Sequence, residues 1–538
     1  MTQETNQSID DALNRHARRM MQPVNHLRHL VNQPDRISRF MLKKAGMRFD
    51  FTRHRIDTQI LSLLHRCAEV KAVPSRFREM MSGNMANPTE NRAALHTATR
   101  SFSHQPVHVN GTDVMPDLER ERKRIRSFSE AIRNGKILGT TGKPLNTIVL
   151  IGIGGSYLGT EFVYQALQAY GKSDIPIHFL SNVDIHQFAD ITRRVDIETT
   201  LWIVISKSYT TPETLANEMQ ATALITESGL NPEQHIITVT GRNSPGDHPK
   251  DGIMETFHMY DYIGGRYSVS SAVGGVPLSI AYGYDIFERF LKGAEEMDRH
   301  ACDAPGEENL PLTAALVSYW NYQFLGYRTQ AIVPYAFPLR KLTAHIQQLH
   351  MESNGKSVTT EGRELPLPAG YIVFGEPGTN AQHSFFQLAH QGQPFPIDFI
   401  GVLHHRYKGA MSCSQGINNH QELWANLLSQ ATALAVGRQS NDAARCFPGN
   451  RPSSLLLIDE ITPENIGRLL SFYEAKTVLE GFLWGTNPFD QFGVELGKVN
   501  ADRVRRAIAR KNSGEDDPFT TLDPMTAFYM HLLSEERP

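Results

Sequence analysis

Two stretches of the chain alternate short apolar runs with longer segments of helical character. In the first, after Asn146, the runs TIVLIGIGG, IHFLSN, LWIVISKS and HIITVT are rich in β-branched residues, and segments long enough for helical crossovers separate them. In the second, AIVPYA (331–336), YIVFGE (371–376) and PIDFIGVLHH (396–405) precede a long helical stretch from Glu422 to about Gly437. Strands that alternate with helices are typical of parallel sheets covered on both faces. The pattern therefore predicts an α/β fold with two doubly wound α/β/α sandwiches.

The segments that flank these sandwiches are predicted to be mainly helical. Residues 1 to about 45 predict a helical, partly frayed arm, and TENRAALHTATR predicts a helix that starts at Thr89. A charged helix (499–511), the solvated break NSGEDDP and a last apolar helix around Met525 to Leu533 follow. We therefore expect a helical N-terminal region (1–120), a first α/β domain (121–295), a second α/β domain (306–510) and a C-terminal tail (511–538), with 306–325 carrying the connection.

Length and charge narrow the class of ligand. A chain of 538 residues is too long for a single hydrophobic core, so we expect two or three domains. The 54 Lys and Arg nearly balance the 57 Asp and Glu. The resulting net charge of -3 lacks the excess of positive charge that is typical of proteins that bind nucleic acid or an anionic membrane. A small, locally recognised ligand is the better expectation.

Cysteine usage and the N-terminus indicate the compartment. The four cysteines form no CxxC or Cys/His metal pattern, so we expect free thiols in a reducing compartment and no metal or other cofactor. The first 21 residues contain acidic positions and no apolar core of a signal peptide. No window approaches the about 18 consecutive apolar residues of a membrane span. A cytoplasmic protein is therefore expected; its cysteines are Cys67, Cys302, Cys413 and Cys446.

The loop IGIGGSYLG predicts an anion site. A strand leads into Gly152, Gly154 and Gly155, and Ser156 is a natural N-cap for the helix that follows. Such a loop presents backbone N–H groups and the positive end of a helix to an anion. Dinucleotide binding would need glycine at 157, where the chain has Tyr157. A tight packing turn without a ligand remains an equal alternative for this loop alone.

A second polar loop follows the strand LWIVIS. It combines four hydroxyls and one ammonium just before Pro212 and Glu213 open a helix. Hydroxyls and helix-end amides at the carboxyl end of a strand are suited to a phosphate monoester. Ordinary helix capping is the alternative, but it would explain one threonine rather than the whole group: Ser206, Lys207, Ser208, Thr210 and Thr211.

The stretch QQLHMESNGK places a carboxylate where an element meets a loop. Glu352 lies among amides, and Ser353, Asn354 and Gly355 are turn formers that end a helix or strand. A glutamate in such a position is usually a solvated surface carboxylate, here beside Lys356. The alternative is a general base, and composition alone leaves both open.

Seven strings in this order resemble the glucose-6-phosphate isomerase family, whose members are built from sugar-isomerase (SIS-type) domains. The resemblance spans roughly residues 45 to 500. The strings are TENRAALH (89–96), IGIGGSYLGT (151–160), SKSYTTPET (206–214), GGRYSVSSAVG (264–274), QLHMESNGK (348–356), GEPGTNAQHSFFQLAHQG (375–392) and FDQFGVELGK (489–498).

The resemblance implies a catalytic set for cofactor-free aldose–ketose isomerisation of glucose 6-phosphate and fructose 6-phosphate. Glu352 matches the family's base, which would move a proton between C2 and C1 through a cis-enediol(ate). Arg266 matches the arginine that stabilises this anion. His383 and Lys498 match the pair that opens the sugar ring, and Gln348 and Gln491 are hydrogen-bonding neighbours.

The resemblance also implies how substrate and subunits are held. The resemblance implies that a homodimer forms in which His383 reaches into the other subunit's site. It also implies that four hydroxyls bind the sugar phosphate, those of Ser156, Ser206, Ser208 and Thr211. The chain departs from the family at Tyr157, Ala381 and His350; Tyr157 and His350 flank site residues and put fine substrate preference in doubt. The candidate binding residues are Gly155, Ser156, Ser206, Lys207, Ser208, Thr210, Thr211, Gln348 and Gln491.

Two other functions are kept open. A dual phosphoglucose and phosphomannose isomerase would share the same residues. A non-catalytic sensor of sugar phosphates on the same domains would keep the phosphate loops and typically lack the base, whereas this chain has Glu352, Arg266, His383 and Lys498.

Overall fold

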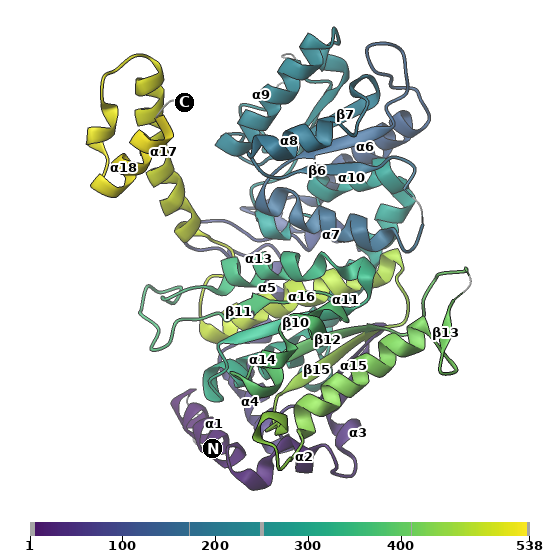
Figure 1. Cartoon of the computed structure of the whole chain (residues 1–538), viewed down its shortest axis with the longest axis vertical. Helices are drawn as coiled ribbons and strands as arrows, with labels where there is room; N and C mark the ends of the chain where they lie inside the picture. Colours follow the sequence, from purple (N-terminus) through teal and green to yellow (C-terminus); the bar gives the residue numbers. More distant parts are fainter. Residues whose placement is uncertain (1–5, 172, 248–251, 410, 535–538) are drawn as a thin grey trace. The chain divides into compact units, whose positions relative to one another are not determined.

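A computed structural model describes residues 6–171, 173–247, 252–409 and 411–534. The chain divides into two compact units, Met1–Phe489 and Asp490–Pro538. The first unit contains two largely parallel sheets with helices on both faces (Figure 1). This architecture is the predicted pair of α/β/α sandwiches.

The first sheet is entirely parallel. Its order is β6-β5-β7-β8-β9, and the four predicted runs form β5 to β8. Strand β9 pairs in parallel with β8 and was not predicted. The strands are β5 (Thr147–Ile151), β6 (Ile177–Leu180), β7 (Thr200–Ser206), β8 (Ile236–Thr240) and β9 (Glu255–His258).

Alternation along β7 explains why helices cover both faces of this sheet. Ile203 belongs to the core that includes α7, while Trp202 and Val204 pack with α8 and α9 on the opposite face. Successive side chains of a strand point to opposite faces, so a strand that is apolar throughout must be covered twice. The helices are α6 (Met115–Arg133), α7 (Leu158–Leu167), α8 (Ile185–Thr192), α9 (Pro212–Glu227) and α10 (Ala272–Tyr282).

The second sheet combines a parallel centre with an antiparallel edge. Its order is β1-β2-β15-β12-β10-β11, with β15, β12, β10 and β11 parallel and β1 and β2 antiparallel. The predicted runs contain β11 and β12 in full and most of β10, whereas β15 was not predicted. The strands are β1 (Met41–Lys44), β2 (Met47–Arg53), β10 (Thr329–Tyr335), β11 (Ile372–Phe374), β12 (Ile397–Val402) and β15 (Ser453–Ile458).

Two helix layers cover this sheet. Helices α14 and α15 pack on one face with Val333, Phe399 and Leu455, and α15 runs across the strands in Figure 1. Ile332 and Ile400 face the other layer, which contains α13 and α16. The helices are α11 (Tyr284–Asp303), α12 (Leu310–Tyr319), α13 (Leu342–Asn354), α14 (Phe386–Gln391), α15 (Asn419–Val436) and α16 (Pro463–Trp484); short hairpins pair β3 (His108–Val109) with β4 (Thr112–Asp113) and β13 (Cys413–Ser414) with β14 (Ile417–Asn418).

The N-terminal region differs from its helical prediction. Residues 41–53 form β1 and β2, because Phe49 and Phe51 are buried on a strand that pairs with β15. The predicted helix from Thr89 is absent: Asn91 has a left-handed backbone (φ 53°), and Asn87 and Arg92 form an isolated bridge. The helices are α1 (Asn6–Met20), α2 (Leu27–Leu30), α3 (Arg36–Phe40), α4 (Thr58–Val70) and α5 (Val73–Met81).

In its described residues, the predicted frayed arm begins with a packed helix, α1. Ile9, Leu13, Ala17 and Met20 are buried one turn apart along α1 and join the main core. Their spacing places them on one face of the helix. Burial of that face ties α1 to the body of the first unit.

Helices α11 and α16 cross at very close range in the core. A Cβ added to Gly467 would lie 2.0 Å from the carbonyl oxygen of Phe290, and one added to Gly293 would lie 2.0 Å from that of Glu464. Beside the crossing, buried Arg100 donates two hydrogen bonds to Asp298 and one to Glu474. The crossing therefore requires glycine on both helices.

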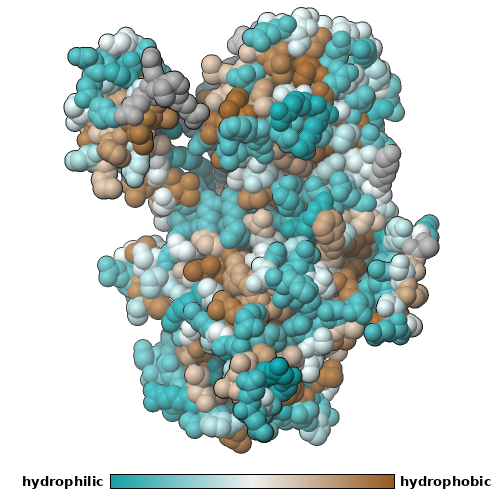
Figure 2. All heavy atoms as spheres, viewed as in Figure 1, coloured by the Kyte–Doolittle hydropathy of each residue, from teal (hydrophilic) through white to brown (hydrophobic). Residues whose placement is uncertain are grey.

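The second unit consists mainly of two helices, α17 (Phe492–Asn512) and α18 (Pro524–Ser534). Both were predicted, although α17 starts earlier than expected. Leu496, Val499 and Phe528 are among its exposed apolar residues, and Figure 2 shows hydrophobic atoms in brown on this unit. Among the described residues, no helix combines the length and apolar character that a membrane span needs.

Candidate active site

Glu352 lies on the last turn of α13, as the turn formers after it predicted. Its Oε2 accepts a hydrogen bond of 2.8 Å from the Gln348 side-chain amide, one turn earlier. Its Oε1 lies 3.4 Å from Nη1 of Arg266. The Glu352 side chain is 19% exposed, whereas that of Arg266 is 1% exposed. A buried cation thus faces a carboxylate that solvent or a ligand can reach.

Ser353 and Pro488 also accept hydrogen bonds from Arg266. Its Nε donates to the hydroxyl of Ser353 at 2.6 Å, and its Nη2 donates to the carbonyl oxygen of Pro488 at 2.8 Å. The next residue, Tyr267, also contacts Ser353 Oγ at 3.0 Å and stacks on the ring of His96. The guanidinium is therefore fixed in direction before any substrate arrives.

Segments far apart in the chain support this arrangement. The Asn487 side-chain amide donates to Asn87 Oδ1 at 2.8 Å and to Thr89 Oγ1 at 2.6 Å. These bonds fix Asn487 in place. The carbonyl oxygen of the next residue, Pro488, accepts the hydrogen bond from Arg266. These contacts place the segment from Thr89, one of the strings that resemble the family, beside the support of Arg266.

The glycine-rich loop lies directly against the loop that carries Arg266. A Cβ added to Gly155 would lie 2.2 Å from the carbonyl carbon of Gly265 and 2.7 Å from the backbone nitrogen of Arg266. Ser268 also donates to the carbonyl oxygen of Gly155 at 3.2 Å. Only glycine permits this approach, which brings the candidate anion loop to the reacting pair.

Ser156 does not cap α7, so that prediction is wrong. The chain first forms a 3₁₀ turn, Gly154–Ser156, and Tyr157 occupies the N-cap position without a side-chain hydrogen bond. The extra turn moves the helix start beyond Ser156. In the described residues the Ser156 hydroxyl has no hydrogen-bond partner, which leaves it available to a ligand.

The second polar loop joins β7 to α9. Ser206 Oγ accepts from the backbone N–H of Tyr209 at 3.1 Å and lies 3.4 Å from Thr211 Oγ1. Thr210 donates to the hydroxyl of Ser208 at 2.8 Å. Thr211 stands at the N-cap of α9, but its side chain does not cap the helix. Because β5 and β7 are parallel neighbours, this loop and the glycine-rich loop leave the same edge of the sheet.

Lys207 connects the second polar loop to the segment before Arg266. Its ammonium donates to the carbonyl oxygens of Asp261 at 2.8 Å and Ile263 at 3.0 Å. Burial lowers the pKa of Lys207 to about 8, although the Asp261 carboxylate opposes the shift. The residue is thus a cation at neutral pH that loses its proton more readily than an ordinary lysine.

Gln348 has an unused polar atom at the site. Its Oε1 is buried and accepts no hydrogen bond from the described residues. Its Nε2 lies 3.2 Å from where a Cβ of Gly154 would be. A buried acceptor without a partner costs free energy unless a ligand or water donates to it.

The remaining predicted residues are His383 in the first unit and Gln491 and Lys498 in the second. His383 is exposed at the end of the 3₁₀ turn Asn380–His383, and within the first unit it makes no hydrogen bond or ion pair with Glu352 or Arg266. Gln491 and Lys498 belong to the second unit, where Gln491 precedes α17 and Lys498 is exposed on that helix. On α14, the ring nitrogen Nε2 of His390 lies 2.9 Å from Gln430 Oε1.

His350 faces the core rather than the cleft. Its ring stacks on Tyr371 at 3.8 Å, and its Nδ1 lies 3.1 Å from Glu480 on α16. Burial lowers the pKa of His350, although the Glu480 carboxylate opposes the shift. The departure at this position therefore gives no direct reason to doubt substrate preference.

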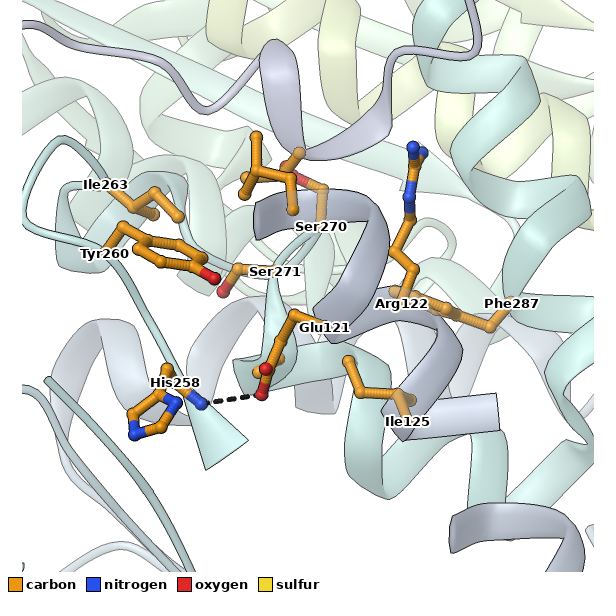
Figure 3. A pocket seen from close by; sticks show the side chains of 12 residues that line it. Glu121, Arg122, Ile125, His258, Tyr260, Ile263, Ser270, Ser271 and Phe287 are labelled. Atoms are coloured by element: carbon orange, nitrogen blue, oxygen red, sulfur yellow. Dashed lines mark hydrogen bonds between the residues drawn. The ribbon is translucent and has the colours of Figure 1, made fainter. Parts of the chain in front are cut away.

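A separate small cavity lies between α6 and the segments around His258 and Ser270. Figure 3 shows Glu121 there, accepting a hydrogen bond of 2.8 Å from the backbone N–H of His258. The cavity has a volume of about 20 Å³, which is enough for one water molecule and too small for a sugar. Over the described ranges, no three His, Cys, Asp or Glu side chains are grouped as a metal site.

The two helix-covered sheets, one parallel and one largely parallel, with a carboxylate–guanidinium pair and two polar loops, define a protein of the sugar-isomerase class. The family model described as phosphoglucose isomerase matches residues 50–522. This chain therefore belongs to the phosphoglucose isomerase family.

Individual relatives agree with this membership. The chain is 54% identical to a glucose-6-phosphate isomerase of Desulfosudis oleivorans, over 97% of this chain and 96% of the relative. It is 41% identical to the cytosolic glucose-6-phosphate isomerase of Spinacia oleracea, over 91% and 90%. The crystal structure of a glucose-6-phosphate isomerase from Chlamydia trachomatis D/UW-3/Cx is similar with a TM-score of 0.88 and 37% identity, over 98% of each chain.

Proposed function

We propose that this protein is a cofactor-free glucose-6-phosphate isomerase that interconverts D-glucose 6-phosphate and D-fructose 6-phosphate in glycolysis and gluconeogenesis. The observation that carries the proposal is the pair of Glu352 and Arg266, whose Oε1 and Nη1 are 3.4 Å apart. Membership of the phosphoglucose isomerase family supports the choice of substrate. The names of the bacterial and plant relatives support it as well.

In this mechanism Glu352 moves one proton between neighbouring carbons. The carboxylate takes the proton from C2 of the open-chain aldose and returns it to C1 of the enediolate, which yields the ketose. The intermediate is an anion, and Arg266 stabilises it because its guanidinium stays charged and is already oriented by Ser353 and Pro488. Gln348 Oε1 would accept a hydrogen bond from a sugar hydroxyl.

The phosphate would lie between the two polar loops. The loop with Gly155 and the uncapped start of α9 follow neighbouring parallel strands at a common edge of the sheet, where their backbone N–H groups and the Ser156 hydroxyl would donate to the phosphate. Lys207 would add a positive charge to the same region. The residues assigned to phosphate are Gly155, Ser156, Ser206, Lys207, Ser208, Thr210 and Thr211.

Ring opening would require one residue from a second copy of the chain. We assign it to His383 and Lys498, with Gln491 as a hydrogen-bonding neighbour, in a homodimer where His383 enters the partner's site. His383 is exposed and does not contact Glu352 in its own first unit, which is compatible with a partner as its target. The exposed apolar residues of α17 and α18 also support assembly, because monomers rarely expose many such residues together.

Two alternatives are separated by simple measurements. Turnover of mannose 6-phosphate would indicate the dual phosphoglucose and phosphomannose isomerase. Binding of fructose 6-phosphate without turnover would indicate the non-catalytic sensor. The chain retains both Glu352 and Arg266 in contact distance, which favours an enzyme over a sensor.

A coupled assay of fructose 6-phosphate turnover, with and without prolonged chelation, tests the proposal. We expect turnover that chelation leaves unchanged. Absence of turnover in folded protein would reject the isomerase function, and a loss restored by Zn²⁺ or Mg²⁺ would reject the cofactor-free mechanism. A cytoplasmic location is part of the proposal and is supported by the cytosolic designation of the spinach relative.

A further inference from the structure

The loop between β7 and α9 contains a residue with an unusual backbone. Tyr209 has φ 51°, in the left-handed region that residues with a side chain adopt rarely and that favours glycine or asparagine. It lies between Ser208 and Thr210, two of the hydroxyls assigned to phosphate. A tyrosine in this conformation must be held there by other contacts.

The ring of Tyr209 provides the first contact. It is 7% exposed and belongs to the cluster that includes Val204 of β7 and Ala221 and Ile225 of α9. Gly246 covers the ring so closely that an added Cβ would lie 2.2 Å from it. The ring therefore fastens the tip of the loop between the sheet, α9 and the segment around Gly246.

The hydroxyl of Tyr209 provides the second contact. It donates a short hydrogen bond to the carboxylate of Glu218, two turns into α9. Burial and the nearby carboxylate raise the pKa of Tyr209, so the hydroxyl keeps its proton. The tip of the loop is thus tied to the same helix whose first N–H groups face the phosphate region.

We propose that Tyr209 and Glu218 are a positioning pair that holds the loop from Ser206 to Thr211 in its phosphate-binding shape. The inference rests on the proposed function, since it concerns the phosphate of that substrate. A loop fixed before binding loses less conformational freedom when the anion arrives, so affinity for phosphate increases. Neither side chain needs to touch the substrate.

The first test is Tyr209→Phe, which keeps the ring and removes the hydroxyl. We expect KM for fructose 6-phosphate to rise about 3- to 10-fold, the effect of one hydrogen bond, while kcat stays within about twofold. The inhibition constant of inorganic phosphate should rise by the same factor. This second readout measures anion binding without catalysis.

Variants at Glu218 test the pairing itself. Glu218→Ala should raise both constants like Tyr209→Phe, and the double variant should be no worse than either single variant, because both remove one interaction. Glu218→Gln keeps an acceptor oxygen and should have a smaller effect. Additive effects of Tyr209→Phe and Glu218→Ala would overturn the pairing.

Tyr282→Phe is the matched control. The Tyr282 hydroxyl donates to the carbonyl oxygen of Tyr164 at 2.8 Å, away from the phosphate loops. It should lower the melting temperature as much as Tyr209→Phe does but leave both constants unchanged. A rise equal to that of Tyr209→Phe would mean a general loss of stability and would overturn the positioning role.

The outcome also separates this inference from the proposed function. If wild-type protein does not turn over fructose 6-phosphate, the proposed function fails. If wild-type protein is active and Tyr209→Phe changes neither KM nor phosphate inhibition, the positioning pair is wrong and the isomerase function stands.

Discussion

Glu352 and Arg266 show how one residue's setting determines its chemistry. The last turn of a helix presents carbonyl oxygens and is unfavourable for an anion, so a carboxylate there needs a positive neighbour. Arg266 supplies it at 3.4 Å and is itself held by neutral acceptors, the hydroxyl of Ser353 and the carbonyl of Pro488. The same guanidinium would also stabilise a second anion, the proposed enediolate.

The ionisation of a second residue, Lys207, predicts that substrate binding depends on pH. Its pKa of about 8 means that the free protein loses this positive charge as pH rises through 8. A phosphate dianion favours the charged form, so substrate binding above pH 8 must be accompanied by proton uptake. We expect KM for fructose 6-phosphate to rise about 3- to 10-fold between pH 7 and pH 9.

Lys207→Met is the control, since it keeps the aliphatic stem and removes the titrating group. Its KM should be higher than that of wild-type protein at pH 7 and nearly constant up to pH 9. A pH dependence equal to that of wild-type protein would show that another group titrates.

At the scale of elements, the crossing of α11 and α16 gives a stability prediction. Gly467→Ala should lower the free energy of unfolding by about 3 kcal/mol or more, because the new methyl group would meet the backbone of Phe290 rather than a movable side chain. Urea unfolding measures this loss as a lower midpoint.

Gly497→Ala is the matched substitution in an open helical position. Nothing lies within 4 Å of a Cβ added there, on α17. Alanine favours helix over glycine by roughly 1 kcal/mol, so this variant should not lower the midpoint. Equal losses for both variants would argue against the close crossing as the cause.

Elements with a strong local pattern could be predicted from the sequence. The β-branched runs at β5, β7 and β8 are buried on both faces, and their apolar character alone identifies them. Strand β2, MRFDFTR, alternates charged and aromatic residues and was missed, because its pairing partner β15 lies about 400 residues later. The turn at Asn91 was read as helix because alanine and leucine follow it, while its left-handed backbone leaves no composition signal.

The site was predictable only in part for similar reasons. Turn formers after Glu352 correctly placed it at an element's end. By contrast, the support of Arg266 by Ser353 and Pro488, and the bond from Asn487 to Asn87 across 400 residues, depend on tertiary contacts that no local pattern encodes. The role of Lys498 was assigned only from the family resemblance, because the sequence around it is that of an ordinary surface lysine.

At the scale of the whole molecule, the proposed shared site makes assembly part of catalysis. Glu352→Gln and His383→Ala should each be inactive alone. When the two variants are refolded together, about half of the dimers should be hybrid, each with one site that takes an intact glutamate and an intact histidine from different chains. Activity should recover toward about a quarter of wild type, since half of the dimers have one live site of two.

The control for this experiment is refolding each variant alone, followed by the same assay. Hybrid formation is measured separately with a charge or affinity tag on one variant. If hybrids form and activity does not recover, His383 acts within its own chain and the shared site is wrong.

Solvent deuterium exchange into C2 of glucose 6-phosphate in Glu352→Gln tests the central claim most directly. The claim is that Glu352 is the base that removes this proton. The variant should keep its affinity for phosphate esters, while exchange and turnover fall together by about 10²- to 10⁴-fold, the usual effect of losing a general base. Exchange at the wild-type rate in Glu352→Gln would contradict the account, because another group would then be removing the proton.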